Sequence, residues 1–221
     1  MLSSISMVLF TGFSLGLLHA FDADHIMAVT TLSTDKPSFK RTITFSAQWA
    51  LGHGGILMLC GLLMFGLGIQ LPASIISVAE SSVGVLLIII GLLCFYQCYK
   101  QKLRLVEHVH GDVKHTHWCL DDIEHQKKNE HTPTFVGMLH GLAGSAPALA
   151  VIPMAGQGQL STAMLYLLLF SVGVLLSMSV FGLGLGSVQR KLKSLDARIF
   201  QFSRYGVSLT SVVLGGYWLM A

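Results

Sequence analysis

Long apolar runs recur along the whole chain and leave few choices of fold. Of its 221 residues, 52% are hydrophobic and 11% are charged, whereas soluble domains carry about 25% charged residues. Runs of about 18 or more apolar residues are long enough to cross the hydrocarbon core of a bilayer as a helix. A helix satisfies every backbone N–H and C=O within its own segment, as a bilayer requires. The sequence therefore predicts an all-α, multi-pass membrane protein with no separate soluble domain.

Six apolar segments are predicted to form six transmembrane helices. They lie near residues 4–33, 43–69, 73–99, 134–156, 160–187 and 199–220. The first is long enough to contain a break. The stretch after Met1 lacks the basic region of a cleavable signal peptide, so the first span is predicted to remain in the protein.

The positive charges predict the orientation of these spans. All fourteen Lys and Arg residues fall in or next to the first, third and fifth connections, on one side of a six-span topology. Because cytoplasmic loops carry the excess of Lys and Arg, both termini are predicted to lie outside a bacterial-type cytoplasmic (inner) membrane. No Lys or Arg is expected inside a span.

Two short motifs occur once in each half of the chain. Gly16-Leu-Leu-His19 returns as Gly137-Met-Leu-His140, and Phe65-Gly-Leu-Gly68 returns as Phe181-Gly-Leu-Gly184. Each half has three predicted spans, so the second half enters from the opposite side. That arrangement is a 3+3 inverted repeat, which is common in secondary transporters. The predicted organisation is a first repeat (1–99), a His-rich cytoplasmic loop (100–133) and a second repeat (134–221).

The fourth predicted span is rich in residues that interrupt helices. It contains Pro147 and Pro153 together with several small residues. Backbone that leaves helical geometry at membrane depth is tolerated where it is buried in protein or lines a cavity. The segment is thus either a break that lines a substrate path or a kinked helix that packs through small residues.

The candidate functional residues are ionisable side chains inside the predicted spans. The residues assigned to this group are His19, Asp22, Asp24, His25, His53 and His140. A carboxylate at the bilayer centre costs roughly 2.5–3.5 kcal/mol. Without a lysine or arginine nearby, its partners must be histidines, water or a bound cation. Imidazoles with carboxylates suit a first-row divalent metal, and a proton relay built from the same groups is the main competitor.

Helical geometry leaves two arrangements open for this cluster. At about 100° per residue, His19, Asp22 and His25 share one face of a straight helix, and Asp24 points away from His19. Either the helix breaks near residues 20–23, or Asp24 accepts the second N–H of a ligating histidine instead of binding the same ion. Whether Asp22 or Asp24 is a direct ligand stays open.

The motif His19-x4-Asp24-His25 resembles the His-x4-Asp-His signature of the nickel/cobalt transporter (NiCoT) family. Leu51-Gly-His-Gly-Gly55 is similar to the second motif of that family, with Gly54 in the place of a serine. Met138-Leu-His-Gly-Leu-Ala-Gly-Ser145 resembles shorter relatives, the UreH-type urease accessory membrane proteins. Typical family members have eight spans, so a six-span chain would join the shorter subgroup. The resemblance implies that His19, Asp24 and His25 recognise the metal and that His53 lies beside them.

The loop at 100–133 contains a second group of metal-binding residue types. Its auxiliary candidates are His108, His110, His115, His117 and Cys119. His-rich tracts bind metals weakly and flexibly, and no spacing here matches a closed zinc site. The loop would accept or deliver metal, with a cytoplasmic metal-accepting protein as its partner, or it is a solvated linker.

The predicted function is secondary transport of Ni²⁺ or Co²⁺, taken as uptake, with export as the alternative. The chain has no Walker motif, so it is not expected to consume ATP. We expect no permanent cofactor, no enzymatic activity and no nucleic-acid partner. The protein is expected to lie in a lipid membrane, and the sequence does not determine its oligomeric state. Because histidines bind metal when neutral, binding should weaken as pH falls.

The sequence favours transport over three other functions. An intramembrane zinc hydrolase would use the same His/Asp cluster, but no His-Glu-x-x-His motif is present. Paired histidines could ligate haem, although neighbouring carboxylates argue against it. A thiol relay would need paired cysteines in the first and fourth spans, and neither span contains a cysteine. The four cysteines are assigned to packing.

Overall fold

The computed structural model describes residues 2–33, 38–68, 72–101, 103–110, 113–120, 131–143 and 160–220. Its helices are α1 (Leu2–His19), α2 (Ala23–Ser33), α3 (Phe39–Gly61), α4 (Ala73–Lys100), α5 (Thr132–Ala143), α7 (Leu160–Leu195) and α8 (Ala197–Met220). A π-helical turn, Leu62–Gly66, continues α3. Strands β1 (Leu103–His110) and β2 (Val113–Leu120) form an antiparallel hairpin within the segment predicted as a loop. The described part of the chain is thus all-α apart from this hairpin.

Several helices are long and apolar enough to cross a membrane. Three qualify alone, Phe39–Gly66, Ser74–Lys100 and Leu160–Leu195, and a fourth candidate is Ser6–His19 joined to Ala23–Ser33 with a bend of 50°. They correspond to the second, third, fifth and first predicted spans. Helix α5 begins the fourth, whose remainder lies outside the described residues, and α8 covers the sixth without qualifying as a candidate. The protein is a multi-pass membrane protein, and the count of six spans remains a prediction.

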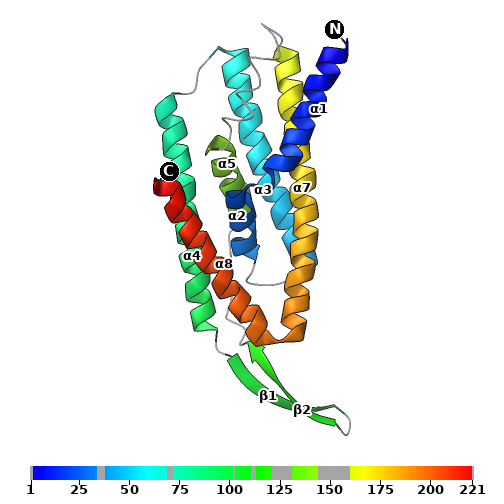
Figure 1. Ribbon diagram of the computed structural model, residues 1–221, viewed down its shortest axis with the longest axis vertical. Helices are drawn as coiled ribbons and strands as arrows, with labels where there is room; N and C mark the ends of the chain where they lie inside the picture. The colour runs from blue at the N-terminus through cyan, green and yellow to red at the C-terminus, as the bar shows by residue number, and fades with distance from the viewer. Residues whose placement is uncertain are drawn as a thin grey trace.

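The helices pack in pairs around a short central helix; α1 and α7 run parallel, α3 and α5 run parallel, and α4 and α8 run antiparallel. Figure 1 shows α1 beside α7, α5 beside α3, and α4 beside α8, with the hairpin leaving one end of the bundle. The central helix is α2, which contacts α3, α4, α5 and α8. Both ends of α2 contribute buried side chains, from Asp24 and His25 to Ser33. The broken first span therefore carries its polar residues into the middle of the molecule.

Glycines allow the backbones of α1 and α7 to approach closely. A Cβ added to Gly16 would overlap the carbonyl of Phe170, and one added to Gly173 would meet the carbonyl of Phe13 at 2.5 Å. Small residues commonly permit such close helix contacts in membranes, where lipid provides no hydrophobic force between helices. These two contacts fix the position of α1 against α7.

The same two contacts occur between α5 and α3. A Cβ on Gly137 would overlap the carbonyl of Trp49, and a Cβ on Gly52 would overlap the carbonyl of Thr134. The corresponding positions all differ by 121 residues: 16 and 137, 13 and 134, 49 and 170, and 52 and 173. His19 and His140 differ by the same 121 positions. One packing arrangement therefore occurs twice in the chain with a constant shift.

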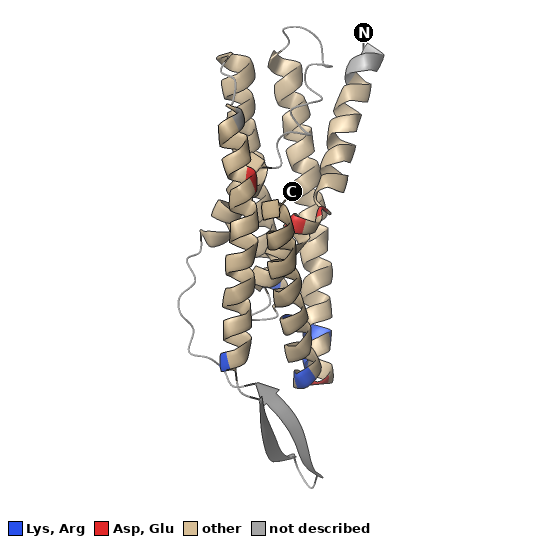
Figure 2. Cartoon of the chain, turned by 60° about the vertical axis from the view of Figure 1, so that its left-hand side comes forward, with Lys and Arg blue, Asp and Glu red and all other residues tan. Residues whose placement is uncertain are grey.

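Two charged residues correct the sequence-based description of the spans. Arg204 is buried in α8, inside the predicted span 199–220, so the expectation of no lysine or arginine within a span is wrong. Its guanidinium donates to the side-chain oxygen of Gln101 at the end of α4. Glu80 lies in α4, within the apolar helix Ser74–Lys100, and was missing from the group of ionisable residues in spans. The described Lys and Arg residues lie mostly toward the end of the bundle that carries the hairpin (Figure 2).

Candidate metal centre

The first span breaks immediately after its first histidine. Helix α1 ends at His19, the N–H of Phe21 donates to the carbonyl of Leu18, and that of Asp22 donates to the carbonyl of His19, both at 3.0 Å. Helix α2 then begins at Ala23 in a direction bent by 50°. The structure has the break, and it also places Asp24 beside the ring nitrogen of His25, as in the second arrangement left open by helical geometry. The break lets Asp24 and His25 approach the same region as His19.

Three histidines from three helices meet beside this break. One ring nitrogen from each of His19, His25 and His53 lies within 4.8 Å of the others. His25 and His53 are almost completely buried, and the side chain of His19 is 11% exposed. The ring centroids of His19 and His25 are 4.6 Å apart, and that of His53 is 5.4 and 5.2 Å from them. We call His19, His25 and His53 the histidine triad.

Each histidine of the triad has at least one buried ring nitrogen without a hydrogen-bond partner. Nε2 of His19 and both ring nitrogens of His25 and His53 have no partner that satisfies hydrogen-bond geometry. An unsatisfied buried polar atom costs roughly 1–3 kcal/mol, and native proteins rarely gather several of them. A divalent cation that accepts one lone pair from each of the three rings would reduce that cost.

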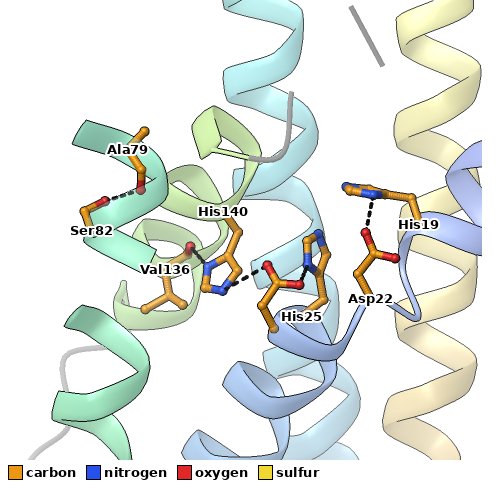
Figure 3. A network of polar contacts seen from close by, with 8 residues as sticks. His19, Asp22, His25, Ala79, Ser82, Val136 and His140 are labelled. Atoms are coloured by element: carbon orange, nitrogen blue, oxygen red, sulfur yellow. Dashed lines mark hydrogen bonds and ion pairs between the residues drawn. The ribbon is translucent and has the colours of Figure 1, made fainter. Parts of the chain in front are cut away.

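Each of the two aspartates lies beside one histidine of the triad. Oδ2 of Asp22 is 2.8 Å from Nδ1 of His19, and Oδ1 of Asp24 is 3.0 Å from Nδ1 of His25 (Figure 3). The side chain of Asp22 is 54% exposed and that of Asp24 is 10% exposed. Asp24 occupies the first turn of α2, where the helix dipole stabilises a carboxylate. Histidines that bind metal usually have such a carboxylate beside their other nitrogen, which orients the ring.

His140 lies close to the triad but is not part of it. Its Nδ1 is 2.8 Å from the carbonyl oxygen of Val136, and its Nε2 is 4.0 Å from Oδ2 of Asp24 (Figure 3). Since a carbonyl can only accept, Nδ1 carries the proton of the neutral ring and Nε2 presents a lone pair. The ring centroid is 5.5 Å from that of His25. All six predicted residues in spans therefore lie in one connected region.

Two aromatic residues form walls of this region, and the sequence interpretation did not include them. The ring of Trp49 stacks on His53 with centroids 5.2 Å apart, and it lies 4.8 Å from His25 and 5.6 Å from His140. Phe170 of α7 lies 5.3 Å from His19. Trp49 precedes His53 by four residues on α3, and this spacing places both on one helix face. No local pattern identifies Phe170, because it arrives from the other half of the chain.

The auxiliary loop residues lie on the hairpin. The register pairs His108 with His115, Val106 with His117, and Arg104 with Cys119. Since alternate positions of a strand belong to one face, His108, His110, His115, His117 and Cys119 all occupy positions on the same face of the ribbon. We call this set the hairpin histidine face. Metal binding by it remains a prediction.

Comparison with known proteins identifies the family. The sequence profile of the cytochrome C biogenesis protein transmembrane region matches residues 8–217. The chain belongs to this family. The urease accessory protein UreH from Bacillus sp. (strain TB-90) is 27% identical over 174 residues, which are 79% of this chain and 74% of the relative. No solved structure matches the chain.

Proposed function

We propose that this family member is a secondary transporter that takes up Ni²⁺ or Co²⁺ through the histidine triad. The observation that carries the proposal is the convergence of three buried imidazoles from α1, α2 and α3, each of which has a ring nitrogen without a hydrogen-bond partner. Imidazole nitrogens favour first-row divalent metals such as nickel, cobalt and zinc. The resemblance of the His19-x4-Asp24-His25 motif to the nickel/cobalt transporters narrows this class to Ni²⁺ or Co²⁺.

The geometry of the triad suits a visiting ion. Metal–nitrogen bonds are about 2.0–2.1 Å long, so two nitrogens on one ion are at most about 4.2 Å apart. The triad atoms lie within 4.8 Å, and a small inward movement of the rings would complete the site. Asp22 and Asp24 would hold His19 and His25 in place and supply negative charge to balance the ion.

The break between α1 and α2 supports transport over a purely structural site. Interrupted helices near the membrane midplane carry the substrate sites of many secondary transporters. His19 ends one half-helix and His25 lies in the first turns of the next. A change in the 50° angle between these halves would separate the ligands and release the ion.

Two rival activities are less well supported. The family profile is named for cytochrome C biogenesis, yet α1, α2 and α5 contain no cysteine for a thiol relay. A zinc hydrolase would need a water on the metal and a general base. Glu80 of α4 is a carboxylate within a candidate span, but the chain has no His-Glu-x-x-His motif. A transporter requires neither feature and uses the histidine triad together with Asp22 and Asp24.

The test is uptake of radioactive nickel by liposomes that contain the purified protein. We expect saturable uptake by the wild type, at least a tenfold loss in His25→Ala and Asp24→Asn, and no change in His131→Ala. His131 is an exposed histidine next to α5 and serves as the matched control. Unchanged flux in both site variants would refute the assigned site. Saturable nickel release without uptake would establish export instead.

A further inference from the structure

The repeated glycine contacts relate the two halves of the molecule in detail. Besides the contacts that pair α1 with α7 and α5 with α3, a third set lies between α3 and α7. A Cβ on Gly61 would overlap Leu167, and a Cβ on Gly182 would meet Ser46 at 2.5 Å. The same shift of 121 residues converts one contact into the other: 61 becomes 182, and 46 becomes 167. The shift therefore exchanges α3 and α7 as well as α1 and α5.

By this correspondence, His19 and His140, the last residues of the two copies of the Gly-x-Leu-His motif, occupy equivalent positions in the two halves. His19 follows Gly16 by three residues on α1, and His140 follows Gly137 by three residues on α5. Both glycines press against a backbone carbonyl of the opposite half. His19 belongs to the histidine triad, whereas His140 does not. In this conformation, therefore, His19 of the equivalent pair belongs to the triad and His140 lies outside it.

The surroundings of His140 contain a gap of ionic dimensions. Its Nε2 is fully buried, bears a lone pair, has no hydrogen-bond partner and lies 4.0 Å from Oδ2 of Asp24. That distance is too long for a hydrogen bond. It lies just within the largest separation that two ligands of one ion can have, because two metal–ligand bonds of about 2.0–2.1 Å span at most about 4.2 Å. A lone pair that faces a carboxylate oxygen at this separation favours a cation between them.

We infer that His140 and Asp24 form a second metal station, to which the ion passes from the histidine triad. The inference rests on the proposed transport function and adds the second position. His25 lies between the two stations, with ring centroids 4.6 Å from His19 and 5.5 Å from His140. Asp24 contacts both His25 and His140. The ion moves from one equivalent histidine to the other, and His25 and Asp24 stay on its path.

The two stations separate binding from transport, and this separation gives the test. Co²⁺ binding to the purified protein and nickel flux into liposomes are measured on the same preparations of each variant. We expect His140→Ala to bind Co²⁺ within about threefold of wild type, because the triad is intact, and to lose at least tenfold in flux. We expect His19→Ala to bind Co²⁺ at least tenfold more weakly. The residual binding should disappear when His140→Ala is added.

Controls make each outcome decisive. His140→Gln keeps a polar side chain of similar length for a case in which the alanine variant does not fold, and His131→Ala should behave like wild type. Equal losses of Co²⁺ affinity in His140→Ala and His19→Ala would overturn the second station and leave one site with four ligands. Normal flux in the His140 variants would also overturn it. A wild type with neither binding nor flux would refute the proposed function itself.

Discussion

The two histidine-bearing regions of this molecule differ in what holds them. The histidine triad comes from three helices, is buried, and is surrounded by aromatic rings and carboxylates. The hairpin histidine face consists of alternate positions on two short strands, and the register of one ribbon determines it. A preformed site binds tightly because its ligands are ordered before the metal arrives, whereas an isolated two-stranded hairpin is marginally stable in water.

From this difference we propose separate tasks for the two regions. Selective binding and release require ligands that come together in one conformation and separate in another. The broken first span has two half-helices that would carry ligands in this way. A histidine-rich ribbon outside the bundle can collect or hand over ions without selecting among them. The following predictions test this division.

Loss of one triad ligand should have the largest effect. His53→Ala removes one of three converging imidazoles, so we expect Co²⁺ affinity to fall more than 100-fold in titration calorimetry of the purified protein. Alanine at all four histidines of the hairpin face should change the tightest binding constant less than twofold. If the hairpin variant lost more affinity than His53→Ala, the assignment of the two regions would be reversed.

Loss of an orienting carboxylate should have a smaller effect. Asp24→Asn keeps the shape but removes the charge beside His25. Groups that orient metal-binding histidines contribute about 10–100-fold in affinity, and we expect a loss in this range by the same titration. Asp22→Asn should lose less, because its side chain is 54% exposed and contacts His19 at the edge of the site. An Asp22 effect larger than the Asp24 effect would make Asp22 the direct ligand.

The packing that holds the triad can be tested by adding a single methyl group. Gly137→Ala places a Cβ against the carbonyl of Trp49, and such overpacking costs about 1–3 kcal/mol. We expect a lower midpoint of thermal unfolding and weaker Co²⁺ binding. Gly184→Ala is the matched control, because nothing lies within 4 Å of a Cβ at that position. Equal unfolding midpoints for both variants would mean that the α3–α5 contact relaxes freely.

The hairpin histidine face should have the smallest effect on transport. Alanine at His108, His110, His115 and His117 should remove weakly bound extra equivalents of Co²⁺ and reduce nickel flux less than threefold. Equilibrium dialysis counts the equivalents, and liposome uptake measures the flux. A tenfold or greater loss of flux would place the hairpin on the transport path and remove the distinction between the two regions.

Local sequence signals identified six ionisable residues that the structure brings into one region. The six ionisable residues stood out because carboxylates and imidazoles are costly in an apolar run. The same residues left two arrangements open, a break near residues 20–23 or an Asp24 that partners a ligating histidine, since His19 and Asp24 cannot share one face of a straight helix. The break lies there, between α1 and α2.

Features that depend on contacts between distant segments could not be predicted in this way. Phe170 reaches His19 because α7 packs on α1 through Gly16 and Gly173, and no local pattern records that pairing. Arg204 is buried because Gln101, from the end of α4, accepts its hydrogen bond. The hairpin was missed because its strands are short, polar and rich in histidine, a composition that resembles a solvated loop.

The visible absorption spectrum of purified protein titrated with Co²⁺ tests the central claim most directly. The account predicts intense d–d bands of a nitrogen-rich, low-coordinate ion that saturate at about one equivalent per chain. These bands should disappear in His25→Ala and His53→Ala and remain in His131→Ala. A wild-type spectrum that stays that of hydrated Co²⁺, or one that is unchanged in both triad variants, would contradict the account.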